Sequence, residues 1–483
     1  MLVLYALIVC LSVTASRIQL NERRYFQDEN GAIRIFHGFN VVYKQAPYIP
    51  KTEGFDYMET FSEEDCQILK NNGFNVIRLH VSFEGAMPNR GELDEQYLDK
   101  ISIIVRMAAK YNIYVILDAH QDLFNRQFCG NGFPDWAIQN VDFPSPSKMQ
   151  MRFDSQGYPL LEDCYQQQFA LFYSTNDIGR HFEMLYENKN GLADYFGQFW
   201  QRIAEKNKYE WNVIGYEILN EPSPGNYEKG KINFFWPGYA NQKYLIKFYR
   251  LIHNYIRKVD NEKIIFFESD FLDLFGAGFD ENIGGVEYQN KEVFSYHVYC
   301  GIEKISSWSC NRIHSLIYYL KMRNVQNLKI GGFLTEFGAV GNDEQSKDIL
   351  DFILDKADVY QQSWTYWQYK GYNDHTTMST MYEEGLFNED GSFQNLKFNA
   401  LRRPYAYQIC ADSIETNQYY SDTKEFFLSF KSKSGCQTKI FIPQQQGSSQ
   451  TFDYKCNNCS LVIIENQHYE VVGEGYIEIY FQL

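Results

Sequence analysis

Hydrophobic residues in the first 400 positions gather in short runs, separated by longer segments with a helical periodicity. The runs are rich in β-branched and aromatic residues, as is typical of strands that are buried on both faces. Eight of them occur, at Ile33–Val42, Val76–Val81, Tyr114–His120, Val213–Asn220, Ile264–Glu268, Val293–Val298, Ile330–Glu336 and Ser363–Tyr369. Helical patterns such as Tyr97–Tyr111, Ala193–Lys206 and Gln242–Val259 lie between most of them. This alternation predicts an α/β fold of the (β/α)8 TIM-barrel type.

The pattern changes after Pro404, where polar and apolar residues alternate between turn residues. The alternating segments are Glu425–Lys431, Lys439–Ile442, Leu461–Glu465, His468–Val472 and Tyr476–Phe481. Alternation of period two predicts antiparallel strands with one buried face. We therefore expect a catalytic barrel over residues 16–403 and a small C-terminal antiparallel β-sandwich domain over residues 404–483. The long connection between Gln121 and Asn212 is expected to be an insertion that shapes the substrate site.

The first 15 residues are predicted to be a signal peptide. An uninterrupted apolar run from Met1 to Leu11 is followed by small residues at Val13 and Ala15, which suit a signal-peptidase site. The alternative is a membrane anchor, but the run is shorter than the ~20 residues that a spanning helix needs. We expect a secreted protein or one of the endomembrane or lysosomal lumen.

Cysteine usage agrees with such a compartment, because nine of the ten cysteines remain after Cys10 leaves with the signal. Cys129 with Cys164, and Cys300 with Cys310, are plausible disulfide pairs that close loops. Four more cysteines lie together near the C-terminus, at Cys410, Cys436, Cys456 and Cys459. Cys66 lies in a helical pattern and is expected to be a free, buried thiol.

Composition narrows the classes of function. Aromatic residues make up 17% of the chain, which excludes a disordered or low-complexity protein. The formal net charge of −16 repels phosphate backbones, so nucleic acid is not an expected partner. The sequence lacks the P-loop, G-x-S-x-G, H-E-x-x-H and G-x-G-x-x-G motifs, and its nine histidines show no tight metal-ligand spacing. We expect no cofactor and no metal.

Two carboxylates stand where barrel strands end. Glu221 closes the fourth predicted strand in Ile218-Leu219-Asn220-Glu221-Pro222, and Glu336 closes the seventh in Thr335-Glu336-Phe337-Gly338. In a barrel both strand ends open on the same face, where active sites are built. A glutamate there can also be a salt-bridged rim residue. Two facing carboxylates, however, are the machinery that cleaves a glycosidic bond.

Further motifs in the same order carry a resemblance to a known family. They are Gly38-Phe39-Asn40-Val41-Val42-Tyr43-Lys44, Asp118-Ala119-His120-Gln121-Asp122, Gly130-Asn131-Gly132-Phe133-Pro134-Asp135-Trp136 and the eighth strand Ser363-Trp364-Thr365-Tyr366-Trp367. Together with Asn-Glu-Pro they resemble the endoglycoceramidase branch of glycoside hydrolase family 5, from about residue 30 to Tyr405. Enzymes of this branch release an intact glycan from the ceramide of glycosphingolipids. Ala119 departs from the methionine more usual before that histidine.

The resemblance implies roles for individual residues. Glu221 would be the general acid and base, and Glu336 the nucleophile. The substrate-binding set would be Lys44, Arg78, His120, Asp122, Trp136, Asn220, His297, Tyr299 and Trp367. Within it, Arg78 and Tyr299 would hold the nucleophile, and Asn220 would bind the sugar 2-hydroxyl. Trp367 would be the platform under the sugar, gripped also by Lys44, His120 and Asp122.

The implied function is a retaining endo-β-glycosidase that cleaves between glycan and ceramide, with transient contact to lipid surfaces or micelles. Aromatic loop residues are candidates for a lipid channel: Phe124, Phe128, Phe133, Trp136, Phe234, Phe235, Trp236 and the run Phe271–Phe279. They could instead pack the loops against the barrel. The alternatives are another family 5 activity (cellulase-like, steryl-glucoside or glucosylceramide hydrolysis) or a glycan-binding barrel without catalysis.

Overall fold

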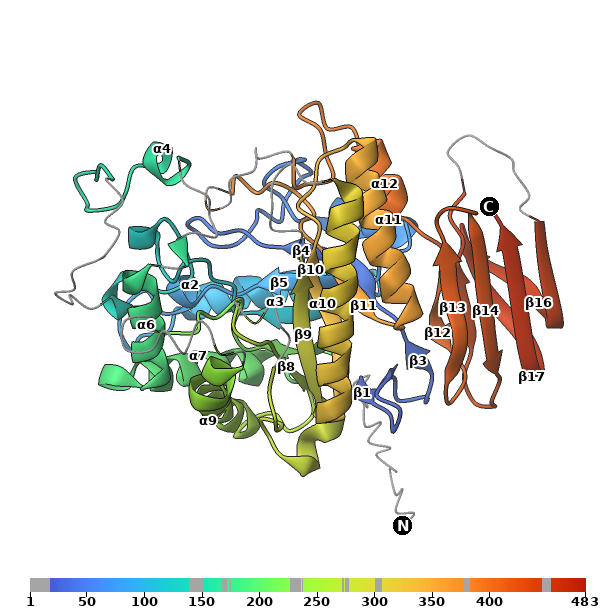
Figure 1. Cartoon of the computed structure of the whole chain (residues 1–483), viewed down its shortest axis with the longest axis horizontal. Coiled ribbons are helices and arrows are strands. Elements are labelled where there is room, and N and C mark those ends of the chain that lie inside the picture. The colour runs from blue at the N-terminus through green and yellow to red at the C-terminus, as the bar shows by residue number, and fades with distance from the viewer. Residues whose placement is uncertain are drawn as a thin grey trace, which may run out of the picture.

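The computed structural model describes residues 18–138, 151–166, 172–173, 175–225, 236, 238–271, 273, 278–299, 306–374, 376, 383–444 and 453–483. Eight parallel strands close into a barrel (Figure 1). They are β4 (His37–Val41), β5 (Val76–His80), β6 (Tyr114–Asp118), β7 (Val213–Glu217), β8 (Ile264–Phe267), β9 (Glu292–Val298), β10 (Gly331–Phe337) and β11 (Ser363–Tyr366). Each falls within or overlaps one predicted run, so the barrel prediction is confirmed.

Amphipathic helices cover the outside of the barrel. The longer ones are α1 (Glu63–Asn71), α3 (Glu95–Lys110), α6 (Asn176–Tyr186), α7 (Leu192–Asn207), α9 (Ile246–Arg257), α10 (Ser307–Leu328), α11 (Glu344–Val359) and α12 (Asn395–Leu401). Asp94 caps α3 by accepting hydrogen bonds from the backbone N–H groups of Gln96 and Tyr97. Figure 1 shows α10, α11 and α12 side by side along one flank of the barrel.

The interior of the barrel changes from apolar to polar along its axis. Inward side chains near the strand starts, such as Val76, Ile264 and Phe333, form an apolar layer that Phe26 closes from below. A Cβ atom on Gly38 would lie only 1.7 Å from the carbonyl oxygen of Val76, so this position of β4 requires glycine. The inward residues at the other end are charged. The apolar layer seals one end of the barrel, and the chemistry is confined to the end where the strands terminate.

The predicted domain boundaries placed the N-terminal segment in the barrel, but in the structure it belongs to the C-terminal sheet. Strands β1 (Gln19–Leu20), β2 (Phe26–Gln27) and β3 (Ile33–Arg34) pair in antiparallel order, and β3 pairs with β12 (Tyr405–Ile409) of the C-terminal sheet. The predicted strand Ile33–Val42 is therefore two strands in different sheets. The chain changes sheet at Ile35 and Phe36, where the Phe36 N–H donates to Ser363 Oγ at 3.0 Å.

The C-terminal region is antiparallel, as predicted. Its remaining strands are β13 (Ile414–Tyr420), β14 (Glu425–Lys431), β15 (Thr438–Phe441), β16 (Asp453–Glu465) and β17 (His468–Gln482). With the N-terminal strands they form one nine-stranded sheet, in which β17 spans both of the last two predicted strands. Figure 1 shows this sheet beyond α11 and α12.

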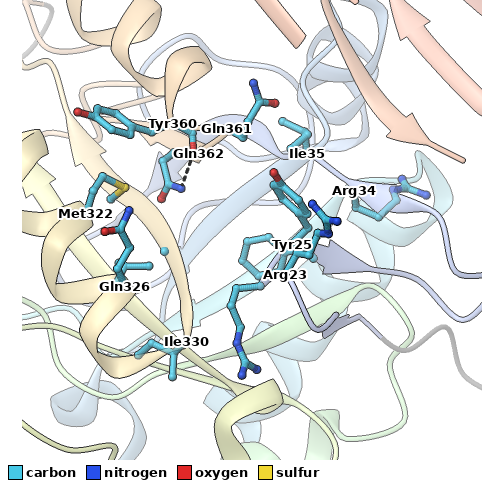
Figure 2. A pocket seen from close by; sticks show the side chains of 14 residues that line it. Arg23, Tyr25, Arg34, Ile35, Met322, Gln326, Ile330, Tyr360, Gln361 and Gln362 are labelled. Atoms are coloured by element: carbon cyan, nitrogen blue, oxygen red, sulfur yellow. Dashed lines mark hydrogen bonds between the residues drawn. The ribbon is translucent and has the colours of Figure 1, made fainter. Parts of the chain in front are cut away.

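Buried polar contacts fasten the sheet to the barrel. Arg403 is almost fully buried, and its Nη2 lies 2.7 Å from Asp355 and 2.8 Å from Asp358 on α11. Tyr405 donates to the backbone oxygen of Gly73 at 2.7 Å. A cavity of about 180 Å³ remains where the N-terminal strands meet α10, lined by residues such as Arg23, Tyr25 and Gln362 (Figure 2).

Two of the cysteine predictions are confirmed. Cys129 is bonded to Cys164, and Cys66 is free and buried. Cys310 is disulfide-bonded, but its predicted partner Cys300 lies outside the described residues. The C-terminal cysteines pair as Cys410 with Cys436 and Cys456 with Cys459.

The predicted signal peptide also lies outside the described residues. Within the described part of the chain, the helices are all too short or too polar to cross a bilayer.

Candidate active site

A buried arginine organises the end of the barrel at which the strands terminate. The Arg78 side chain projects inward from β5 and is fully buried. Its Nε lies 2.5 Å from Glu217 of β7, and its Nη1 lies 2.5 Å from Glu336 of β10. A third carboxylate, Asp118 of β6, lies 3.0 Å from Nη2. The guanidinium keeps its charge at every accessible pH and so offsets the cost of burying these carboxylates.

Glu221 and Glu336 face each other across this end. Glu221 follows β7, and its Oε1 lies 2.8 Å from His297 Nδ1. Glu336 accepts a hydrogen bond from the Tyr299 hydroxyl at 2.9 Å. One oxygen of each carboxylate and a nitrogen of His297 lie within 4.8 Å of one another. Retaining glycosidases hold their two carboxyl groups about 5–5.5 Å apart and inverting ones about 6.5–9.5 Å, so this spacing favours retention.

The two glutamates lie in different electrostatic surroundings. Burial, with Asp122 nearby, raises the pKa of Glu221 to about 7. Burial also raises the pKa of Glu336 above its ordinary value, but the positive charge of Arg78 opposes this shift. Burial lowers the pKa of His297 to about 4, so its imidazole is neutral at neutral pH. Glu221 is therefore suited to carry a proton, while Glu336 faces hydrogen-bond donors and a cation.

A cluster of polar groups around Lys44, which follows β4, lies beside the two glutamates. Lys44 Nζ lies 2.7 Å from Asp122, 2.6 Å from Asp374 and 2.8 Å from Thr376 Oγ1. Burial would raise the pKa of Asp122, but Lys44 and His120 hold it well below its ordinary value. Such an array of fixed donors and acceptors suits the hydroxyl groups of a sugar.

An aromatic ring completes the pocket. The Trp367 ring stacks on His120 at 5.0 Å between centroids, and Lys44 Nζ lies 4.7 Å from the ring centroid. Trp367 Nε1 donates to Glu384 at 2.7 Å, which holds the indole in place. Burial would lower the pKa of His120, but Asp122 and Asp118 raise it to about 9. A fixed aromatic face flanked by cations is a suitable platform for a sugar ring.

The structure brings together ten of the eleven residues that the sequence analysis selected. Asn220 joins them through its Oδ1, which accepts from Arg78 Nη2 at 2.8 Å. Trp136 does not join them. Its Nε1 donates to the backbone oxygen of Met87 at 2.8 Å, and its ring packs against Phe83 and Tyr195. Among the described residues, the indole of Trp136 contacts Met87, Phe83 and Tyr195 rather than the catalytic pair, so the loop after β6 directs it away from the site.

Sequence reasoning missed several charged residues of the site. Asp118, Glu217 and Glu268 project into the same end of the barrel, and Glu384 fixes the Trp367 ring. Side-chain parity could have found Glu268, since Ile264, Phe266 and Glu268 share one face of a strand. Glu384 lies 17 positions after its partner Trp367, and no periodic pattern marks it.

A closed (β/α)8 barrel with paired glutamates at the ends of its fourth and seventh strands, beside a polar and aromatic sugar pocket, defines a glycoside hydrolase. The sequence model of the cellulases, glycosyl hydrolase family 5, matches residues 41–373. The endoglycoceramidase of Cyanea nozakii is 36% identical over 424 residues, covering 86% of this chain and 82% of that protein. The endoglycoceramidase of Hydra vulgaris is 36% identical over 459 residues, covering 92% and 84%.

Solved structures share the fold. Endo-glycoceramidase II from Rhodococcus sp., in its complex with ganglioside GM3, superposes with a TM-score of 0.74 at 18% identity, over 95% of this chain and 99% of that one. The chain belongs to glycosyl hydrolase family 5, in the branch formed by the endoglycoceramidases.

Replacing Tyr299 by phenylalanine tests the environment of Glu336. The variant loses the hydroxyl that donates to Glu336, and a hydrogen bond to a charged group contributes about 1.5–3 kcal/mol. Because this bond favours the carboxylate, we expect the pKa of Glu336 to rise by about one unit. The acid limb of kcat/KM should then move to higher pH by the same amount, if Glu336 must be ionised.

Tyr296→Phe is the matched control. Tyr296 lies on β9, the strand that Tyr299 directly follows, and its hydroxyl donates to Gln362 Oε1 at 3.2 Å. Its pH profile should match that of the wild type. An unchanged acid limb in Tyr299→Phe would contradict the proposed stabilisation.

Proposed function

We propose that this chain is a retaining endo-β-glycosidase that hydrolyses the bond between the glycan and the ceramide of glycosphingolipids. The observation that carries the proposal is the close pair of carboxyl groups of Glu221 and Glu336, which lie in different electrostatic surroundings beside the pocket of Lys44 and Trp367. The names of its relatives add the substrate class: two are endoglycoceramidases, and one solved neighbour is complexed with a ganglioside.

The first step forms a bond to Glu336. Its carboxylate attacks the anomeric carbon while the bond from that carbon to the ceramide oxygen breaks, and Glu221 gives its proton to the departing oxygen. Glu221 serves as this acid only while protonated, so the step slows as the pH rises through its pKa of about 7. Ceramide leaves as an alcohol, and a glycosyl–Glu336 ester remains.

The second step releases the glycan. Glu221, now a carboxylate, takes a proton from a water molecule whose oxygen attacks the anomeric carbon. The bond to Glu336 breaks, and Glu336 becomes a carboxylate again. Because each step inverts the anomeric carbon, the product keeps the β configuration.

The surrounding residues hold the sugar and the nucleophile. Arg78 and Tyr299 bind Glu336, and Asn220 is placed to bind the sugar 2-hydroxyl, an interaction that strengthens in the transition state. Lys44, Asp122 and His120 bind further hydroxyl groups of the same sugar. His297 contacts Glu221, and Trp367 lies under the ring.

Several of the aromatic loop residues that the sequence analysis named as candidates for a lipid channel are not placed to form one. Phe124, Phe133 and Phe279 are buried in the packing of the barrel and its loops, so they do not line an open channel. Phe128 and Phe271 are half-buried, and Phe234 and Phe235 lie outside the described residues. In contrast, Trp236 is 66% exposed and Trp308 is 65% exposed.

Trp236 follows β7 and Trp308 follows β9. Both therefore lie in connections that begin at the end of the barrel where Glu221 lies. Phe153 and Tyr165, in the long segment after β6, are also exposed. Exposed tryptophans with an apolar body suit the boundary between lipid and water. We propose that they contact the lipid surface from which ceramide is drawn.

We also propose that the protein acts outside the cytosol, secreted or in the lumen of an endomembrane compartment or lysosome. The predicted signal peptide supports this, and so do the three described disulfides, which are typical of oxidising compartments.

Exchange of each glutamate for glutamine tests the two roles. Glu336→Gln should leave almost no turnover, about 10³-fold or more below the wild type, because the nucleophile is gone. Glu221→Gln should keep activity on glycosides with good leaving groups, which need no acid. Azide should accelerate only the Glu221 variant and yield a β-glycosyl azide, detected by NMR. Rescue of Glu336→Gln alone would reverse the roles.

Substrate comparison tests the ceramide assignment. One oligosaccharide is joined to ceramide, to a short alkyl group or to another sugar. Because each buried methylene contributes about 0.8 kcal/mol, kcat/KM should be at least tenfold higher for the ceramide conjugate. Products should be intact oligosaccharide and ceramide. Equal kcat/KM values would instead indicate a cellulase-like β-glycanase, and the absence of hydrolysis with retained binding would indicate a glycan-binding barrel.

Trp236→Ala and Trp308→Ala extend this comparison to the lipid surface. Both should lower activity on vesicle-embedded substrate and leave the soluble short-alkyl conjugate unaffected. Tyr209→Ala is the control, since Tyr209 is 79% exposed but precedes β7 at the opposite end of the barrel. Equal losses in all three variants would contradict the proposed lipid contact.

A further inference from the structure

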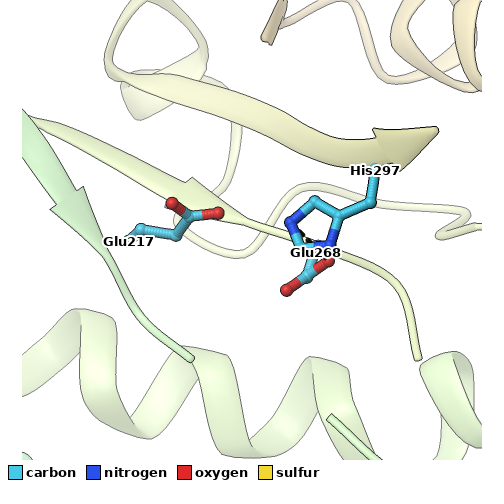
Figure 3. A group of neighbouring side chains, drawn as sticks. All are labelled: Glu217, Glu268 and His297. Atoms are coloured by element: carbon cyan, nitrogen blue, oxygen red, sulfur yellow. Dashed lines mark ion pairs between the residues drawn. The ribbon is translucent and has the colours of Figure 1, made fainter. Parts of the chain in front are cut away.

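A buried carboxyl group lies directly behind Glu221. Glu268 is the first residue after β8, and its side chain points into the barrel. Its Oε1 accepts a hydrogen bond from the backbone N–H of Glu221, and its Oε2 lies 3.8 Å from His297 Nε2. Figure 3 shows Glu268 against the His297 ring, with Glu217 on the neighbouring strand. Glu268 thus contacts both the main chain of Glu221 and the side chain that binds its carboxylate.

The backbone of Glu221 needs such support. Its φ is +38°, in the left-handed region that residues with a side chain rarely adopt. Such a conformation persists only where the surroundings hold it. Here Glu268 binds the N–H of the residue, and Gln121 Nε2 donates to its carbonyl oxygen at 3.0 Å. The main chain of Glu221 is therefore held on both sides by buried side chains.

The imidazole of His297 links Glu268 to the carboxylate of Glu221. A neutral imidazole has one N–H, and Nδ1 lies 2.8 Å from Glu221 Oε1. If Nδ1 donates to this oxygen, Nε2 has a free lone pair, and in the structure Nε2 is buried without a hydrogen-bond partner. Glu268 Oε2 is the polar atom that faces it.

Glu268 can supply the missing proton. Burial, together with Glu217 and Glu221, holds the pKa of Glu268 well above its ordinary value, which favours the protonated, neutral carboxyl group. A neutral carboxyl accepts through one oxygen and donates through the other. Its C=O oxygen accepts from the Glu221 N–H, and its O–H would face His297 Nε2, which lies 3.8 Å from Glu268 Oε2. The other charged groups that act on His297 are Glu336, Arg78, Asp118 and His120.

A metal site is the alternative use of these groups. Atoms of Glu217, Glu268 and His297 lie within 4.8 Å of one another and are of the types that bind divalent cations. Glu217, however, is already paired with the Arg78 guanidinium at 2.5 Å, which places a fixed positive charge beside the group.

We propose that Glu268 is a positioning residue for Glu221: it holds the strained main chain of Glu221 and fixes the His297 tautomer that donates to Glu221 Oε1. The second oxygen of Glu221 is then left for proton transfer to the ceramide oxygen and from water. This inference rests on the proposed function, since it assumes that Glu221 is the acid and base.

The test compares two substrates of the full-length enzyme, the oligosaccharide–ceramide and the dinitrophenyl glycoside of the same oligosaccharide. Only the first needs an acid to help its leaving group depart. We expect Glu268→Leu to lower kcat/KM for the ceramide conjugate about 100-fold, within the range of general acid catalysis, and to change that for the dinitrophenyl glycoside less than threefold. The alkaline limb should move to higher pH, because the Glu221 carboxylate loses a donor.

Glu268→Gln should keep the ratio of the two kcat/KM values within threefold of the wild type. The glutamine amide oxygen can accept from the Glu221 N–H, and its NH₂ group can donate to His297 Nε2. Glu292→Leu is the matched control. Glu292 is a buried glutamate that accepts from the Gly284 N–H at 2.5 Å, with a pKa raised to about 8 by burial, but it begins β9 at the other end of the barrel. It should leave the ratio unchanged.

Equal losses on both substrates in Glu268→Leu would overturn the proposal and assign Glu268 a merely structural role. Inactivation by EDTA with recovery on adding Zn²⁺ would overturn it in favour of a metal site. Failure of the proposed function is distinguished by Glu221→Gln, which would then show no dependence on the leaving group.

Discussion

The ion cluster around Arg78 is the constraint on which this active site depends. Its guanidinium contacts carboxylates from three strands and also Asn40 of β4, so with its own strand β5 it links five of the eight barrel strands at their catalytic end. Burying one unpaired carboxylate is costly, and burying several requires a cation among them. A neutral side chain at position 78 would remove the cation that contacts Glu217 and would leave His120 to offset the charge of Asp118 and Glu336. The same charge that permits the fold therefore holds the nucleophile.

The distribution of charge around this cluster gives the two glutamates different properties. Glu336 faces the Arg78 guanidinium and the Tyr299 hydroxyl, which stabilise its carboxylate against the effect of burial. Glu221 is buried and lies near Asp122, whose negative charge disfavours a second one. Unequal surroundings for two similar carboxyl groups allow one to act as a nucleophile and the other as an acid at the same pH. The division of labour thus follows from placement.

Much of this arrangement could be predicted from the sequence because it is local. Apolar runs mark the strands, and strand ends place Glu221 and Glu336 on one face. The pairing of β3 with β12 could not be predicted in this way, because it joins residues separated by more than 370 positions. Whether Trp136 and Phe124 line a channel or pack against the barrel could not be decided from the sequence, since an aromatic residue in a loop has no periodicity that separates burial from exposure. Glu268 was visible by strand parity, but its role depends on contacts with Glu221 and His297 that only the fold creates.

Trapping the covalent intermediate tests the central claim most directly. A 2-deoxy-2-fluoro glycoside with a good leaving group slows both steps, the second more than the first, so the glycosyl-enzyme accumulates. Peptide mass spectrometry then identifies the labelled residue. We expect one glycosyl group attached to Glu336 in the wild type, and none in Glu336→Gln. A label on Glu221, or the release of α-configured product without any label, would contradict it.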